Sequence, residues 1–268
     1  MDAQLSERPA ATDDTEPDAR EINDLLLRVM WGVNSQAFRL FGNRVVSGPF
    51  AGMIIPDRNP FWDDGNAGAK LLGTYEFELH PMIEHAIWRG PRSVINVGCA
   101  EGYYAIGLAR LLPQAVVHAF DSRADSLQLC REYAEKNGVS ERVATREGCE
   151  TPQQMRVVGT EWPRLYLLDC EGAEADLLDL DKLPSLAYSD IIVECHDFLI
   201  PGISSVIADR LSATHRVELI RPKLPDLEQF QFMRQFPTVM SVLMATEKRP
   251  MPSMWLACWA NTKGISDG

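Results

Sequence analysis

The sequence carries little positive charge for its length, and this scarcity excludes several classes of partner. Its 268 residues include 26 Lys and Arg against 38 Asp and Glu, a formal net charge of -12. Proteins that bind nucleic acids usually gather basic residues on one face, because the phosphate backbone is a polyanion. We therefore expect no nucleic-acid partner and no attraction to an anionic membrane surface.

Long apolar runs are also missing. No segment approaches the ~20 consecutive apolar residues that a membrane-spanning helix needs, and the first residues lack the basic-then-apolar order of a secretory signal. The six cysteines stand singly, without a Cys-x-x-Cys pair that would indicate a zinc or redox site. These absences predict a cytoplasmic protein that does not cross a membrane and whose cysteines are reduced.

The composition divides the chain into three parts. Residues 1–20 mix proline, alanine and acidic residues, which predicts a disordered acidic tail. Residues 21–90 start with apolar residues at helical spacing and continue through a Gly-, Pro-, Asn- and Asp-rich stretch. This pattern predicts a helical and loop extension that acts as a lid, with the loop at 61–62 near the substrate. Residues 91–268 form the main domain, with an insertion at 221–252 that is too long for an ordinary connection.

Short apolar runs alternate with helical patterns from residue 91 onwards. The alternation predicts β-α-β units on a doubly wound, mainly parallel sheet, an α/β fold. A helix over 76–88 precedes these units, and Ser126 is the expected N-cap of a later helix. The expected strands are 93–97, 116–120, 142–146, 165–168, 190–193, 217–220 and 255–260.

The stretch at 94–104 reads as a strand, a glycine turn and the start of a helix. Glycines let the backbone approach a ligand, and the first turn of a helix offers N–H groups without partners. The spacing is Gly98-x-Ala100-x-Gly102, and Tyr103 stands where a dinucleotide fingerprint needs its third glycine. This spacing argues against NAD and resembles motif I of class I S-adenosylmethionine-dependent methyltransferases.

An acid follows the second expected strand. Asp121 lies about 20 residues after Gly102, near the offset at which a carboxylate accepts the ribose hydroxyls of a nucleotide in such folds. The alternative role for Asp121 is to cap the helix that follows.

Three further blocks narrow the resemblance: G-T-Y-E at 73–76, D-C-E-G-A-E at 169–174 and E-C-H at 194–196. In this order they are similar to blocks of the FkbM-type methyltransferases, over roughly 73–220. The resemblance implies a seven-stranded Rossmann-like sheet with helices on both faces. It also implies S-adenosyl-L-methionine as the cofactor and O-methylation of a small-molecule or sugar hydroxyl.

The resemblance also implies a set of cofactor-binding residues. Two of them depart from the family's pattern, because Asn96 stands where an acid is usual and Cys149 where an adenine-binding Asp is common. An amide does not attract the cationic amino group of the cofactor, so we expect weaker binding there. The set comprises Glu76, Asn96, Gly98, Ala100, Glu101, Gly102, Tyr103, Asp121, Ser122, Gly148, Cys149 and Asp169.

The expected catalytic residues are Asp169, Glu194 and His196, which follow strands at the edge of the sheet where ligands bind. His196 is the preferred general base, because an imidazole titrates near neutral pH. The alternative is a histidine that only bonds the turn after its strand. The same residues suit Mg²⁺ or Mn²⁺, so a divalent metal is left open but not favoured. Glu171 and Glu174 have a simple alternative role as acids at a helix start.

Two other classes of function compete with this interpretation. One is a non-catalytic Rossmann-like binding or regulatory module, which the residues Asn96 and Cys149 favour. The other is a methyltransferase that acts on nitrogen or on RNA. The sequence does not name the acceptor, and it leaves a homo-oligomer open.

Overall fold

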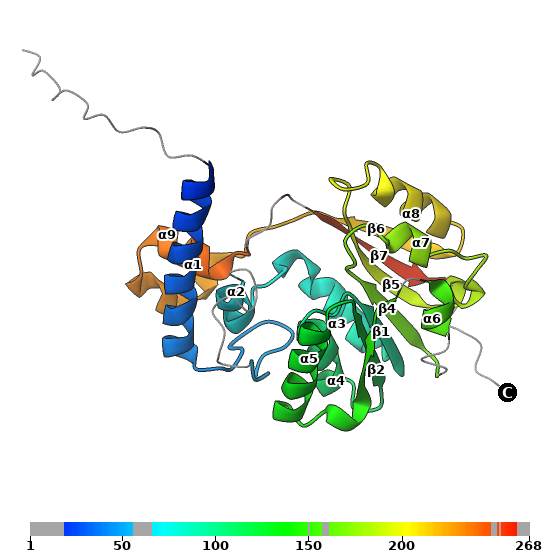
Figure 1. Ribbon diagram of the computed structural model, residues 1–268, viewed down its shortest axis with the longest axis horizontal. Coiled ribbons are helices and arrows are strands. Elements are labelled where there is room, and N and C mark those ends of the chain that lie inside the picture. Colours follow the sequence, from blue (N-terminus) through cyan, green and yellow to red (C-terminus); the bar gives the residue numbers. More distant parts are fainter. Residues whose placement is uncertain are drawn as a thin grey trace, which may run out of the picture.

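A seven-stranded sheet forms the centre of the computed structural model (Figure 1), which describes residues 19–55, 66–149, 151–156, 161–247, 251 and 253–261. The expected tail falls almost entirely outside these residues, as does the loop at 61–62. The strands are β1 (Ser93–Val97), β2 (Val116–Asp121), β3 (Val143–Glu147), β4 (Arg164–Leu168), β5 (Asp190–Cys195), β6 (His215–Ile220) and β7 (Met254–Ala260).

The strand order is β3-β2-β1-β4-β5-β7-β6, with β7 antiparallel to both of its neighbours and the other pairs parallel. This arrangement confirms the predicted doubly wound, mainly parallel seven-stranded fold. The order reverses between β1 and β4, where Val97 lies opposite Leu168. In open α/β sheets a ligand binds in the crevice beyond such a switch point.

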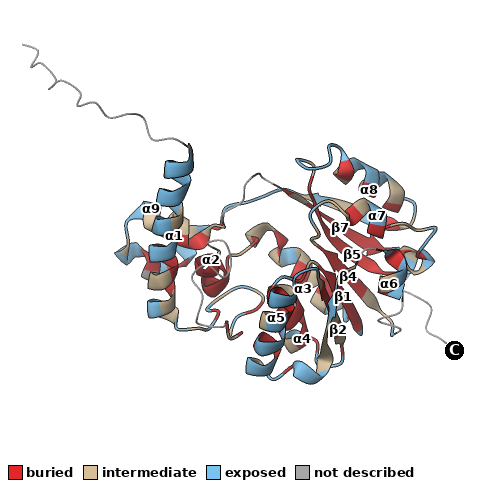
Figure 2. Cartoon of the chain, in the orientation of Figure 1, coloured by how far each residue is buried: buried red, intermediate tan, exposed pale blue. Residues whose placement is uncertain are grey.

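The side chains of alternate residues on the inner strands point into two separate hydrophobic cores, one on each face of the sheet. Figure 2 shows that these strands are buried. Val94 faces one core and Ile95 the other, as the two-residue period of a strand requires. The first core is covered by α3 (His80–Arg89), α4 (Tyr103–Leu111) and α5 (Ala124–Lys136). The second is covered by α6 (Pro152–Arg156), α7 (Glu174–Leu177) and α8 (Ile203–Leu211).

Three helices from distant parts of the sequence pack together beside the sheet (Figure 1): α1 (Ala19–Phe41), α2 (Ala67–Leu72) and α9 (Thr238–Ala245). The backbone N–H of Gly68 donates to Asn34 Oδ1 at 2.9 Å, and the Thr74 hydroxyl donates to the Ala245 carbonyl at 2.7 Å. The expected extension and the expected insertion thus share one structure, which we call the helical lobe. Its role as a lid stays a prediction.

Short 3₁₀ turns lie between several of these helices and strands. They are η1 (Phe77–Leu79), η2 (Ser140–Arg142), η3 (Pro184–Tyr188), η4 (Leu227–Gln229) and η5 (Gln231–Gln235). Among the residues described, none of the helices combines the length and the apolar character needed to span a membrane.

Two helix starts differ from expectation. The helix expected over 76–88 begins at His80, because Glu76 has a left-handed backbone (φ 46°) and a 3₁₀ turn follows it. Ser126 is not an N-cap, since α5 already starts at Ala124 and places Ser126 inside its first turn.

Candidate active site

The turn after β1 brings the ends of β1 and β4 into direct contact. Gly98 has a φ of +75°, and a Cβ atom there would lie 1.6 Å from the Asp169 carbonyl oxygen. Gly102 has a φ of +99°, and a Cβ atom there would lie 2.7 Å from Cys130 Sγ. Both positions therefore require glycine for conformation and for space.

A cavity of about 360 Å³ opens beyond this turn. Most of the predicted cofactor residues line it, although they come from the ends of four different strands. They are Gly98, Ala100, Asp121, Ser122, Gly148, Cys149 and Asp169. The cavity thus lies where the switch point of the sheet predicts a ligand site.

Asp121 lines this cavity at the end of β2. One carboxylate oxygen accepts the N–H of Ala100 at 2.8 Å, and the other accepts the N–H of Arg123 at 2.8 Å. Each carboxylate oxygen has two acceptor sites, so these bonds leave capacity for the hydroxyls of a ribose. Asp121 does not cap α5, whose N-cap is Arg123, so the alternative role is wrong; its carboxylate bonds the turn after β2, and the cofactor role stays a prediction.

Burial raises the pKa of the Cys149 thiol to about 11. Cys149 is therefore a neutral side chain at physiological pH. It gives the cavity an apolar wall at the position where an acid was expected from the family resemblance.

Five predicted cofactor residues lie outside the lining of this cavity, and one of them, Glu76, lines the second cavity described below. Glu101 turns toward the helical lobe, where its carboxylate forms a buried ion pair with Lys70 Nζ at 2.7 Å. Tyr103 packs edge-on against Phe50 and Tyr75, each at 5.3 Å between ring centroids. The side chains of Glu101 and Tyr103 therefore contact the helical extension instead of lining the cavity.

The other two residues act through the backbone or within the sheet. Gly102 shapes the turn, as described above. The Asn96 amide donates to the Leu167 carbonyl at 3.3 Å, and its Oδ1 is buried without a hydrogen-bond partner. Asn96 therefore ties β1 to β4 instead of facing the cavity.

A second cavity of about 140 Å³ adjoins the first. Asp169 and Glu171 line both cavities, so they mark the place where the two meet. We call the second cavity the carboxylate pocket, because acids dominate its lining. It is lined by Asn66, Tyr75, Glu76, Asp169, Glu171, Glu194, His196, Phe198, Glu247, Met251 and Ser253.

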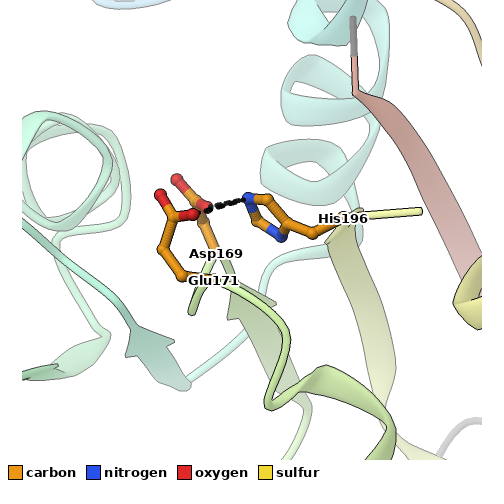
Figure 3. Close-up of side chains that lie close together, drawn as sticks. All are labelled: Asp169, Glu171 and His196. Carbon is orange, nitrogen blue, oxygen red and sulfur yellow. Dashed lines mark ion pairs between the residues drawn. The ribbon is translucent and has the colours of Figure 1, made fainter. Parts of the chain in front are cut away.

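His196 contacts the carboxylate pocket on one side of its ring and the buried acid Glu174 on the other. Figure 3 shows the ring directed toward Asp169 and Glu171. Its Nδ1 lies 2.8 Å from Glu174 Oε1, and Glu174 is fully buried. Its Nε2 lies 3.6 Å from Asp169 Oδ1 and 3.6 Å from Glu171 Oε2. An ionised Glu174 can only accept, so Nδ1 carries the proton of that bond and Nε2 faces the pocket.

The surroundings shift the pKa values of these groups in different directions. Burial alone would lower the pKa of His196, but the hydrogen bond to Glu174 and the nearby charge of Glu194 raise it overall. Burial alone would raise the pKa of Glu174, but the bond to His196 and the N–H of Gly172 lower it overall. Desolvation raises the pKa of Asp169 to about 7.

Two groups of side chains have the donor atoms that a divalent cation requires. Asp169, Glu171 and His196 bring their ligand atoms within 4.8 Å of one another, and so do Glu76, Asp169 and Glu194. Carboxylates and imidazole suit Mg²⁺ or Mn²⁺. These residues could hold a divalent cation. The expectation that the protein works without a metal ion stays a prediction.

Residues 91–149 match the family model described as a methyltransferase domain. The match runs from the residues before β1 to the turn after β3, which includes the glycine turn and Asp121. It confirms the prediction of a methyltransferase domain, with S-adenosylmethionine as its cofactor, for this segment. The narrower resemblance to the FkbM type stays a prediction.

Two curated relatives match short stretches of the chain. The release factor glutamine methyltransferase of Chlorobaculum tepidum is 47% identical over 82 residues, covering 27% of this chain and 27% of that protein. The release factor glutamine methyltransferase of Synechocystis is 37% identical over 54 residues, covering 20% of this chain and 18% of that protein. The matched stretches span about a quarter or less of the length of these relatives.

Solved structures with similar folds cover more of the chain at low identity. An O-methyltransferase from Bacillus cereus in complex with SAH is 15% identical, with a TM-score of 0.48, and covers 90% of this chain and 96% of that one. The O-methyltransferase TomG from Streptomyces achromogenes in complex with SAM is 14% identical, with a TM-score of 0.46, and covers 87% of this chain and 90% of that one.

Some residues in or behind the carboxylate pocket were not predicted to take part in binding or catalysis. Glu174 was expected to begin a helix, and it does begin α7, but its carboxylate also holds His196. Its place in the D-C-E-G-A-E block was the available signal. Glu247 and Phe198 come from segments without a motif, so no pattern in the sequence distinguished them.

Proposed function

We propose that this chain transfers the methyl group of S-adenosylmethionine to a hydroxyl of a small molecule. The observation that carries the proposal is the meeting of two cavities at Asp169 and Glu171, with His196 Nε2 facing the second one. A methyl donor in the first cavity would present its sulfonium toward an acceptor in the second.

The first cavity offers each part of the cofactor a matching group. Asp121 would accept the ribose hydroxyls, and the neutral wall at Ser122 and Cys149 would lie along the adenine. The methionyl part would then extend past Gly98 toward Asp169, where the two cavities meet. Negative charge from Glu171 and Glu76 favours a cationic sulfonium at this place.

The residues of the carboxylate pocket supply what the reaction needs. Methyl transfer is an in-line displacement, in which the acceptor oxygen attacks the methyl carbon and the sulfur leaves with the bonding electrons. His196 Nε2 would take the hydroxyl proton, and the buried Glu174 would stabilise the imidazolium that forms. Glu76 and Glu194 would accept hydrogen bonds from the acceptor and orient it.

The curated relatives favour a second acceptor class, an amide nitrogen, because they are named as glutamine methyltransferases. We place the hydroxyl first because a histidine held by a buried acid suits the removal of a hydroxyl proton. The E-C-H and D-C-E-G-A-E blocks that supply this pair also support the FkbM type. We retain from the sequence a cytoplasmic location and the absence of a nucleic-acid partner.

Calorimetry with S-adenosylhomocysteine tests the cofactor site directly. We expect the full chain to bind it, and we expect Asp121→Ala to weaken binding by about 1.5–3 kcal/mol, through the loss of charge-assisted bonds to the ribose. Asp121→Asn is the matched control, because it keeps the side-chain shape and one acceptor, and we expect a smaller loss. Absence of binding to the unmodified chain would contradict the proposed function.

A further inference from the structure

A third cavity, of about 250 Å³, lies next to the carboxylate pocket. The segment from Thr74 to Glu78 lines both cavities, with Tyr75 and Glu76 in the carboxylate pocket and Phe77 in the third cavity. Glu247 also lines both. The two cavities therefore adjoin along these residues.

The third cavity differs from the carboxylate pocket in its chemistry. Half of its lining is apolar and comes from three separate segments, and no acid of the catalytic group takes part. We call it the apolar cavity. Its apolar residues are Phe77, Pro222, Leu224, Pro225 and Ala245, and its remaining lining is Thr74, Glu78, Lys223, Thr246 and Glu247.

Fixed contacts hold the walls of the apolar cavity in place. The Thr74 hydroxyl donates to the Ala245 carbonyl at 2.7 Å, which ties the wall near the sheet to the end of α9. Lys223 Nζ lies 5.9 Å from the centroid of the Phe77 ring. Leu224 is 70% exposed, so a ligand that covers it would remove a large apolar side chain from water.

We propose that the apolar cavity holds the non-reacting body of the methyl acceptor, so that the acceptor is a hydroxyl compound with an apolar ring or chain. This inference rests on the proposed function, because the reacting hydroxyl must lie in the carboxylate pocket next door. A free sugar fits less well, because hydroxyls on all its sides would lose water against Phe77, Leu224 and the prolines.

The test uses the full chain loaded with S-adenosylhomocysteine and a series of simple hydroxyl probes: phenol, 4-propylphenol, 4-hexylphenol and methyl α-glucoside. Calorimetry measures the affinity for each probe. We expect affinity to rise by up to about fourfold for each added methylene, as burial of apolar surface predicts, and we expect the glucoside to bind more weakly than 4-hexylphenol.

Leu224→Asp places a charge at the rim of the apolar cavity without disturbing a buried residue. We expect it to weaken the binding of 4-hexylphenol by about tenfold while that of phenol stays the same. Leu25→Asp is the matched control, because Leu25 is 63% exposed on α1 and lines none of the three cavities, and we expect no change.

The outcomes separate this inference from the proposed function. Equal affinity for phenol and 4-hexylphenol, or an equal loss in both Asp variants, would overturn the apolar subsite while the binding of S-adenosylhomocysteine remained. Failure of the unmodified chain to bind S-adenosylhomocysteine at all would instead remove the proposed function, and the inference would fall with it.

Discussion

At the scale of single residues, two acids beside one histidine differ in charge because their surroundings differ. Burial alone would raise the pKa of Glu174, but the bonds that it accepts from His196 Nδ1 and from the N–H of Gly172 lower its pKa overall. Asp169 lies among other acids, and desolvation raises its pKa to about 7. Glu174 is therefore a fixed charge that holds the histidine, whereas Asp169 changes charge near neutral pH.

The pH dependence of turnover should reveal this arrangement. His196 must be neutral to take a proton, and its pKa lies above the ordinary value, so we expect kcat/KM to rise as the pH increases through that raised pKa. Glu174→Gln removes the charge that raises it, so the rise should move to lower pH while kcat falls.

A pH series of initial rates measures this shift. Glu171→Gln is the control, because the Glu171 side chain is 76% exposed and water screens its charge, so its profile should move less. Profiles that coincide for Glu174→Gln and the unmodified chain would show that Glu174 does not raise the pKa of His196.

His196→Ala tests the general base itself. We expect this change to lower kcat by ~10²–10⁴-fold and to leave the affinity for S-adenosylhomocysteine unchanged.

Chelation distinguishes a histidine base from a metal at the same residues. We expect EDTA to leave turnover unchanged, because His196 and its acid can accept the proton without a cation. A loss of turnover that Mg²⁺ or Mn²⁺ restores would instead indicate a metal at Asp169, which belongs to both candidate groups of cation ligands.

At the scale of elements, the turn between β1 and α4 fixes the geometry of the site. Gly98 lets the end of β1 lie against the end of β4, and Gly148 donates its N–H to the Asp121 carbonyl at 2.8 Å. The proposed cofactor cavity therefore depends on how closely four neighbouring strand ends can approach. A side chain at Gly98 would push two of them apart.

Two glycine substitutions with similar backbone angles test this dependence. Gly98 and Gly138 have φ values of +75° and +67°, so alanine at either position costs roughly 1–2 kcal/mol for its left-handed backbone. Only at Gly98 does the new methyl group also meet the backbone, at Asp169. We expect Gly98→Ala to abolish the binding of S-adenosylhomocysteine and Gly138→Ala to leave it intact.

Urea unfolding of both variants, together with calorimetry, provides the measurement. Gly98→Ala should lose more free energy of unfolding than Gly138→Ala, because the clash at Gly98 adds to the same backbone cost. Similar losses in the two variants, with binding retained in both, would show that the turn tolerates a side chain.

At the scale of the whole molecule, the helical lobe and the sheet are joined by a buried ion pair. Lys70 on α2 and Glu101 at the start of α4 lie 2.7 Å apart, with 3% and 5% of their side chains exposed. Lys70 Nζ also lies 4.4 Å from the centroid of the Tyr75 ring. The helix α2, which precedes the turn that carries Tyr75 and Glu76, is thus tied to the glycine turn after β1.

Removal of the Lys70 charge should destabilise the fold, because it leaves the charge of Glu101 buried without a partner. We expect Lys70→Met to lower the free energy of unfolding by about 3–5 kcal/mol, because Glu101 would stay buried without its cation. The double variant with Glu101→Gln should recover much of this loss. Urea unfolding measures both, and a double variant no more stable than Lys70→Met would contradict the argument.

The sequence by itself determined the sheet and the cofactor turn, because both depend on local patterns. Short apolar runs that alternate with helical patterns predicted all seven strands within a few residues. The spacing of Gly98 and Gly102 predicted a tight turn, since few other residues accept those backbone angles. The short helix α2 was missed because all its residues are buried, so it has no exposed face to give a helical period.

Only the tertiary structure decided which way individual side chains point and which distant segments meet. Glu101 and Tyr103 sit in the motif yet face the lobe, because Lys70 and Tyr75 lie on that side of α4. Glu174 reaches His196, 22 positions further along, through the folding of β5 beside β4. Such contacts join residues far apart in the chain, so no local spacing can encode them, and the carboxylate pocket forms only when the sheet and the lobe pack together.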